Sequence, residues 1–263
     1  MKHVHASFTL VLTAAALWLA SPGRAMAGEP IDITQASALA GNLSPGDAPG
    51  FPITLSRSGH YRLTGDLTVP ADTGGIVIVA PNVTLDLGGH RIRGPVRCKY
   101  NEATLVVSCN AESRFSAVVG ISSVGASGAV IRNGTVQGFA GLGVHYGEGT
   151  VLEQLQVRAN AGVGIAGMGY ATVGVVRAVR VQHNGGPGIV CEQMRIEHST
   201  FAANGSTGVD CRGSWFVDTV TRHNGGHGVA EGAKVGLRSF GNKLGDEAGV
   251  AADRLPVQLN AAR

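Results

Sequence analysis

Apolar and polar residues alternate along the chain in short segments that are separated by turn residues. Within residues 83–87, valine and leucine at every second position alternate with threonine and aspartate. A period of two is typical of strands with one buried face. Residues 128–136 repeat the pattern, and these segments have neither the period nor the length of helices. We therefore expect an all-β chain of short strands.

From residue 136 onward, a unit of about 20 residues recurs, with asparagines spaced by 24, 20, 20 and 18 residues. A unit this small cannot bury its own apolar face, so successive units must stack on one another. Asparagine and glycine supply the special backbone angles of sharp turns, and stacked asparagines can hydrogen-bond between units. These features predict a single-stranded parallel β-helix. The recurring asparagines are Asn160, Asn184, Asn204, Asn224 and Asn242.

The repeat divides the chain into regions. We assign residues 61–252 to the parallel β-helix, with roughly seven coils. Residues 28–60 combine a short helical segment with a loop rich in glycine and proline. We expect them to form an N-terminal cap, because the open end of a stack of strands invites aggregation. Residues 253–263 form a C-terminal tail.

Residues 1–27 have the features of a secretory signal peptide. A basic start, an apolar stretch from Phe8 to Ala20 and the small residues of an Ala-Met-Ala ending follow one another. The apolar stretch is too short to remain as a comfortable membrane span. We expect cleavage near Ala27, no membrane insertion after cleavage, and a secreted or periplasmic protein.

The net charge and the amino-acid composition limit which partners and which kind of core we expect. Loss of Lys2 and Arg24 with the signal peptide would lower the net charge from +3 to +1. That balance gives no reason to expect nucleic acid or an anionic membrane as a partner. The chain has 40 glycines and only 5% aromatic residues, so the core must consist of small and β-branched side chains.

Four cysteines follow the predicted signal peptide, which indicates an oxidising compartment. Cys191 and Cys211 are one repeat apart, at inward positions of adjacent coils, about 4.8 Å apart. This distance suits a disulfide. We favour a disulfide over two free thiols packed in the core, and no ligand spacing supports zinc. Cys98 and Cys109 bracket a short polar segment, where a second disulfide would staple a loop.

Three segments resemble a known family: Gly-Asp-Ala-Pro-Gly-Phe-Pro-Ile-Thr-Leu at 46–55, Gly-His-Tyr-Arg-Leu-Thr-Gly-Asp-Leu-Thr-Val-Pro at 59–70, and Val-Thr-Leu-Asp-Leu-Gly-Gly-His-Arg-Ile-Arg-Gly at 83–94. With the Asn-Gly-rich coils that follow, they look like bacterial right-handed parallel β-helix repeat proteins of the pectin/pectate lyase-like superfamily. The resemblance covers most of residues 46–250. It implies a right-handed scaffold and suggests polysaccharides as ligands, although most such proteins have no assigned activity.

Strand alternation places His145 and Asp210 in one outward column, three coils or about 14 Å apart. This distance is too long for a direct acid–base pair. Arg212, near Asp210, is the best cation for neutralising a uronate carboxylate during an elimination. The alternative is that all three are ordinary surface residues.

His227 lies in a Gly-His-Gly segment that resembles a motif of polygalacturonases. Those enzymes also need an Asp pair, and this chain has no consecutive aspartates. Other coils carry unrelated residues at this turn, so we favour a variable turn residue. No cofactor is expected; calcium is an alternative if Asp210, Asp218 and Glu231 converge.

Our first hypothesis is an exported β-helix that presents an elongated face to a polysaccharide or cell-surface glycan, without a complete catalytic set. One alternative is a polysaccharide-processing enzyme, such as a uronate lyase, an epimerase or a glycoside hydrolase. Its candidate catalytic residues are Asp210, Arg212, His227 and His145. A further alternative is a structural envelope or adhesion module. The sequence does not predict the oligomeric state.

Overall fold

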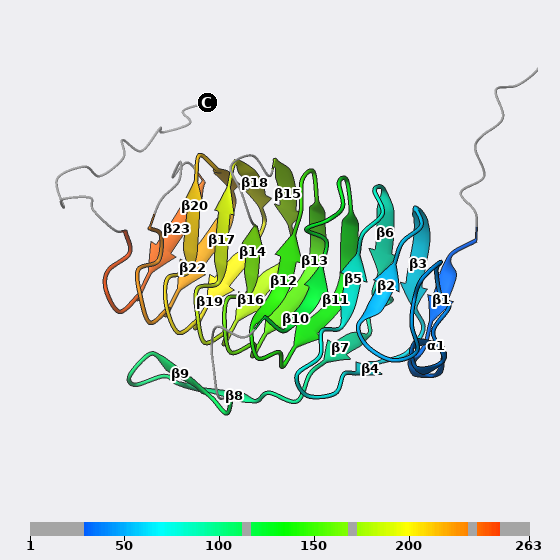
Figure 1. The fold of residues 1–263 in the computed structure, drawn as a ribbon. Coiled ribbons are helices and arrows are strands. Elements are labelled where there is room, and N and C mark those ends of the chain that lie inside the picture. The colour runs from blue at the N-terminus through cyan, green and yellow to red at the C-terminus, as the bar shows by residue number, and fades with distance from the viewer. Residues whose placement is uncertain (1–28, 112–116, 168–172, 231–235, 248–263) are drawn as a thin grey trace, which may run out of the picture.

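The computed structural model describes residues 29–111, 117–167, 173–230 and 236–247. The chain winds into successive coils whose strands pair in parallel with those of the coil before, and the coils form one elongated stack (Figure 1). The helix α1 (Gln35–Ala40) lies beside the first coils, and Thr34 caps its N-terminus. Within the described ranges, no helix is long and apolar enough to cross a membrane. The expected signal peptide and C-terminal tail lie outside these ranges.

The strands of the coils form three faces. The first face is a seven-stranded sheet, whereas the second and third faces join in one fourteen-stranded sheet because two long strands run through both. The first face consists of β2 (Ile53–Leu55), β5 (Ile76–Ile78), β10 (Val119–Ser122), β12 (Leu142–Tyr146), β14 (Ile165–Gly167), β17 (Ile189–Glu192) and β20 (Val209–Arg212).

The second face begins with β1 and ends, in the described ranges, with β21. It consists of β1 (Ile31–Ile33), β3 (Gly59–Leu63), β6 (Val83–Asp86), the first halves of β11 (Val130–Gln137) and β13 (Val151–Arg158), β15 (Gly174–Arg177), β18 (Met194–Glu197) and β21 (Trp215–Val217).

The third face follows the second in each of the seven coils that begin with β2 to β20. It consists of β4 (Leu67–Thr68), β7 (Arg91–Arg93), the second halves of β11 and β13, β16 (Arg180–Gln182), β19 (Thr200–Ala202), β22 (Thr219–Arg222) and β23 (Leu237–Phe240).

This architecture confirms the predicted parallel β-helix. Ile189 pairs with Val209, which pairs with Val229, and all three are fully buried in the core. Seven coils contribute a strand to the first face, and Val229 begins an eighth. The stack also starts earlier than expected. The strands β1 and β2 lie in the region that we assigned to the cap, yet they already pair in parallel with the next coil.

The recurring asparagines form the predicted ladder inside the stack. Each side-chain Nδ2 donates to the Oδ1 of the asparagine one coil further on, and that oxygen also accepts the backbone N–H of the donor asparagine at 3.0 to 3.2 Å. The Nδ2 to Oδ1 distances along Asn160, Asn184, Asn204, Asn224 and Asn242 are 3.0, 3.0, 3.1 and 2.9 Å. Buried amides are therefore paired from coil to coil, as burial demands.

The sharp corners differ from our expectation for asparagine. The ladder asparagines are not in the left-handed region; the residue before each of the first four is, with φ between 53° and 59°. One left-handed residue bends the chain, and the asparagine that follows is free to point inward. These corner residues are Ala159, His183, Ala203 and His223.

An outward column of alternating charge follows the second face. One charged residue per coil lies in register with the next, and the sign changes at each step. Arg132 shows the pattern: its guanidinium lies 3.0 Å from Asp86 and 3.9 Å from Glu153. We call this column the charge ladder. Its members are Asp32, Arg62, Asp86, Arg132, Glu153, Arg177 and Glu197.

We predict that Asn204→Ala lowers the free energy of unfolding by roughly 2 to 4 kcal/mol, because four buried hydrogen bonds are lost. The Asn184 backbone N–H loses its acceptor, whereas Asn184 Nδ2 keeps the Val157 carbonyl and Asn224 Oδ1 keeps the Asn204 N–H. Denaturant unfolding followed by circular dichroism measures the change. The matched control is Asn242→Ala, the last asparagine of the ladder, which is 9% exposed and has exposed neighbours in the chain, so water can reach the lost bonds more easily than at the fully buried Asn204. Equal losses in the two variants would contradict the ladder's role.

Candidate functional site

A hairpin interrupts the regular winding between the third face of one coil and the first face of the next. It consists of β8 (Cys98–Asn101) and β9 (Val106–Cys109), which pair in antiparallel fashion. We call residues 96–110 the arm. In Figure 1 the arm runs along the stack toward its C-terminal end. The space between the arm and the third face is a cleft of about 600 Å³.

The arm is closed at its base. Cys98 and Cys109 lie opposite each other in the hairpin and form a disulfide, as predicted. Beside them, the Arg97 N–H donates to Asn110 Oδ1 at 2.7 Å, and the Asn110 N–H donates to the Arg97 carbonyl at 3.1 Å. At the other end, the Asn101 side chain accepts two backbone N–H groups of the turn. The arm is thus a defined hairpin of its own.

The arm also rests on the coils beneath it. The Tyr100 hydroxyl donates to the His223 carbonyl at 3.0 Å, and the Tyr100 ring stacks on His183 with 5.4 Å between ring centroids. Val107 is buried. A side chain at Gly225 would lie 2.7 Å from the Leu105 carbonyl, so glycine permits this close approach. These contacts hold the arm across several coils.

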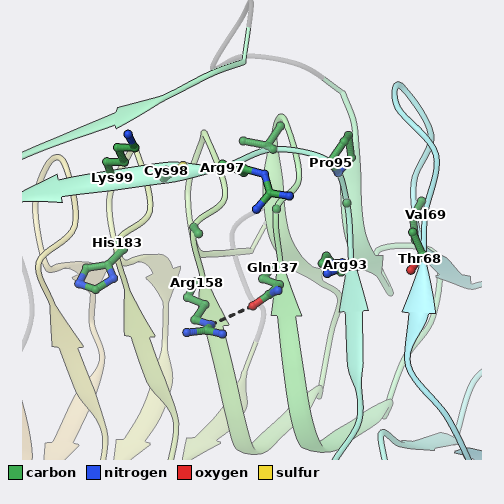
Figure 2. Close-up of a pocket in the computed structure, with 14 residues that line it drawn as sticks. Thr68, Val69, Arg93, Pro95, Arg97, Cys98, Lys99, Gln137, Arg158 and His183 are labelled. Carbon is green, nitrogen blue, oxygen red and sulfur yellow. Dashed lines mark hydrogen bonds between the residues drawn. The ribbon is translucent and has the colours of Figure 1, made fainter.

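Cations converge on the cleft from two directions. Arg93 and Arg158 come from the third face and Arg97 comes from the arm, whereas Lys99 lines the cleft from the arm with its side chain extending away from the face (Figure 2). No lining residue is acidic. The cleft is lined by Thr68, Val69, Arg93, Gly94, Pro95, Val96, Arg97, Cys98, Lys99, Gln137, Gly138, Arg158, Ala159 and His183.

The strand register fixes the spacing of the two arginines on the third face. Arg93 pairs with Gln137, which pairs with Arg158, so the arginines are two coils or about 10 Å apart. The Arg158 Nε donates to Gln137 Oε1 at 2.9 Å, which orients the guanidinium along the column. The remaining guanidinium N–H groups are suited to bind a carboxylate or sulfate.

His183 lies at the far end of the cleft. Burial lowers the pKa of its imidazole, and the positive charge of Arg158 lowers it further, while Glu102 acts in the opposite direction. The imidazole is therefore neutral at neutral pH. A neutral imidazole next to an arginine can accept a proton, but the cleft has no lining carboxylate to form the paired acids of a glycoside hydrolase.

The residues singled out from the sequence lie elsewhere. His145, in β12, and Asp210, in β20, occupy one column of the first face, separated by Ala166 and Val190, so they stand three coils apart as expected. Arg212 is two residues further along β20. None of the three lines the cleft.

The two histidine candidates each have a buried nitrogen. His145 Nε2 and His227 Nδ1 have no hydrogen-bond partner in the described part of the chain, and burial lowers the pKa of His145. The His227 carbonyl accepts the Gly208 N–H at 2.8 Å in a turn between coils. The structure does not bring either histidine to the cleft.

The sequence also left calcium open. Of the three residues considered, Glu231 lies outside the described ranges, so their convergence cannot be described. Within the described ranges, no three His, Cys, Asp or Glu side chains gather to hold a metal. Cys191 and Cys211 do pair as predicted and lie in register on β17 and β20.

Sequence reasoning missed the cleft, although part of its signal is local. Four cations stand within residues 91–99, with no acidic residue among them. Arg91 is paired with Asp66, but in the described structure Arg93, Arg97 and Lys99 have no ion-pair partner. The contribution of Arg158 depends on the register of distant coils, which the local sequence does not contain.

Comparison with known proteins agrees with this fold. The family model described as "Right handed beta helix region" matches residues 96–243, more than half of the chain, so the chain belongs to this family. No curated protein matches. Among solved structures, the Dettilon tailspike protein matches over 70% of this chain and 38% of its own, with a TM-score of 0.54 and 18% identity. The tailspike likeness shows the fold alone.

We predict that His183 makes the protein less stable as the pH falls from about 7.5 to about 5. The folded state disfavours the protonated imidazole, whereas the unfolded chain protonates near the ordinary pKa of about 6.5. The unfolded state then binds more protons, so the free energy of unfolding falls. His183→Asn should make the loss of stability smaller, because it removes the titrating imidazole. Asparagine is the replacement because it tolerates the left-handed backbone of this corner. Denaturant unfolding at both pH values measures this.

The matched control is His198→Asn, at an exposed corner with φ of 48°. This variant should keep the pH dependence of the wild type. If His183→Asn also keeps it, the buried imidazole is not the source.

Proposed function

We propose that this protein is an exported polysaccharide-binding β-helix that holds an anionic glycan in the arm cleft without turning it over. One observation carries the proposal: cations from the arm and from the third face line a single cleft that has no acidic residue in its lining. Membership of the right-handed β-helix family, together with the resemblance of residues 46–94 to the pectin/pectate lyase-like superfamily, supports a polysaccharide as the ligand.

The chemistry of the lining favours a chain of uronate or sulfated sugars. Arginine binds carboxylate and sulfate groups through paired N–H donors, and Arg93 and Arg158 offer two such groups along the stack. The Arg97 guanidinium approaches from the arm, so a ligand between arm and face meets positive charge on both sides. An extended chain that lies parallel to the stack satisfies this arrangement.

Two disulfides favour export. Disulfides persist in oxidising compartments and are rare in the cytosol of most cells, and all four cysteines of this chain are paired. The signal peptide expected at residues 1–27 fits the same destination. We therefore place the protein in the periplasm or outside the cell.

A uronate lyase is the second candidate, favoured by the neutral His183 near Arg158. An elimination needs a base for the sugar C5 proton and a cation that neutralises the neighbouring carboxylate. His183 and Arg158 have the right chemistry for these two roles. Absorbance of the unsaturated product, with polygalacturonate and alginate as substrates, separates the candidates. If the wild-type protein forms product steadily and His183→Asn abolishes this activity, the protein is a lyase and the non-catalytic proposal is wrong.

We predict that Arg158→Gln weakens binding of an anionic glycan about 10- to 100-fold, because it removes a charge-assisted contact in the cleft. Titration calorimetry with polygalacturonate, alginate and dextran sulfate measures the affinity, and uncharged dextran should not bind. Added salt should weaken binding, since part of the attraction is between exposed charges.

The matched control is Arg180→Gln. Arg180 is exposed on the same face, in register with Gln156 and Thr200, and does not line the cleft. It should retain the wild-type affinity. Equal losses in both variants would point to general charge rather than to the cleft, and failure of the wild-type protein to bind any of the charged glycans would refute the proposal.

A further inference from the structure

The two disulfides differ sharply in their access to solvent. Cys191 and Cys211 lie in the core with 4% and 0% of their surface exposed. Cys98 and Cys109 are only partly buried, and Cys98 lines the cleft. A dissolved reductant can therefore reach one disulfide while the other stays protected in the folded protein.

The surroundings of Cys98 also favour its reduction. Arg97 and Lys99 flank it in the chain, and both line the same cleft. Positive charge attracts an attacking thiolate and stabilises the thiolate that leaves, which speeds thiol–disulfide exchange. The core disulfide belongs to the buried apolar core, where a thiolate is disfavoured, although the Ser214 hydroxyl lies 3.7 Å from Cys191 Sγ.

The shape of the cleft depends on this bond. The arm is a two-stranded hairpin, and isolated hairpins are marginally stable in water. The arm meets the coils through the Tyr100 hydrogen bond and ring stacking, the buried Val107, the hydrogen bonds at its base and the close approach of Leu105 to Gly225. One further contact is made by the disulfide itself, with Cys109 Sγ 4.0 Å from the Asn160 carbonyl. The disulfide closes that base directly beside Arg97 and Lys99, half of the cleft's cations. Opening the bond frees these cations to leave the cleft.

We propose that Cys98–Cys109 is a regulatory disulfide, and that its reduction by a dithiol loosens the arm and releases the anionic glycan. One thiolate of the dithiol attacks a sulfur of the pair, which breaks the S–S bond and forms a mixed disulfide. The second thiolate displaces the remaining cysteine, and the reductant leaves as a cyclic disulfide. The two cysteines gain two electrons and two protons. This inference rests on the proposed function of the cleft.

Ligand binding and reduction should oppose each other. A glycan in the cleft covers Cys98 and neutralises the cations that assist the exchange. Because coupling between two equilibria is reciprocal, a ligand that binds the oxidised form better must also hold the disulfide closed. Protection by a ligand is therefore a required consequence.

The first experiment treats the full chain with dithiothreitol without denaturant, alkylates the free thiols and locates them by mass spectrometry. We expect Cys98 and Cys109 to be labelled at least about tenfold faster than Cys191 and Cys211, in line with their exposure. Saturating polygalacturonate should slow labelling of the first pair. Equal labelling of the two pairs would overturn the proposal.

The second experiment follows the arm itself, without a glycan. Hydrogen exchange of residues 97–109 should rise after selective reduction, while exchange of the β-helix core stays unchanged. Selective reduction without this rise would also overturn the proposal. If the oxidised protein binds no glycan but hydrogen exchange of the arm still rises on reduction, the proposed function is refuted. The redox response of the arm would then stand on its own.

The third experiment compares affinities. The Cys98→Ser/Cys109→Ser protein should bind polygalacturonate about tenfold more weakly and keep its midpoint of unfolding, because the arm is not part of the stack. The Cys191→Ser/Cys211→Ser protein should unfold more readily yet bind as the wild type does. If that control fails to fold, selectively reduced and alkylated wild-type protein gives the same comparison. Unchanged affinity after loss of Cys98–Cys109 would refute the coupling.

Discussion

The parallel register of successive coils is the constraint on which the rest of the structure depends. Each coil has unpaired backbone groups and an apolar edge until the next coil covers them, so no coil is stable alone. The buried asparagines fix the register, because an amide that donates to one neighbour and accepts from the other has its partners only when coils lie directly above one another. Registered coils then place side chains in columns, and columns make binding surfaces.

The candidate site arises where this regularity is interrupted. The arm is inserted at the end of the third face in one coil and returns to the first face of the next. The regular part of the stack supplies Arg93 and Arg158 at a fixed spacing, and the insertion supplies Arg97 and Lys99 from a separate hairpin. The regular spacing on one side and the disulfide-closed hairpin on the other fit the repeating polysaccharide that we propose as the ligand.

Much of the fold could be predicted from the sequence because its physics is local or periodic. The asparagine spacing gave the coil length, and Cys191 and Cys211 gave a pair of stacked positions. The arm cleft could not be predicted, since it depends on how a hairpin from one coil lies across later coils. The sequence of residues 96–110 does not predict that Tyr100 hydrogen-bonds to His223, more than a hundred residues away. The charge ladder was missed because insertions make the spacing of its members irregular.

The charge ladder has a consequence for assembly errors. Neighbours in the column carry opposite charge, so residues two coils apart carry the same charge: Asp86 and Glu153 are both acidic, and Arg132 and Arg177 are both basic. If the chain skipped one coil while winding, like charges would face each other across the gap, and each contact would repel. The column therefore disfavours any stack in which one coil is skipped, an error that the uniform apolar core would tolerate.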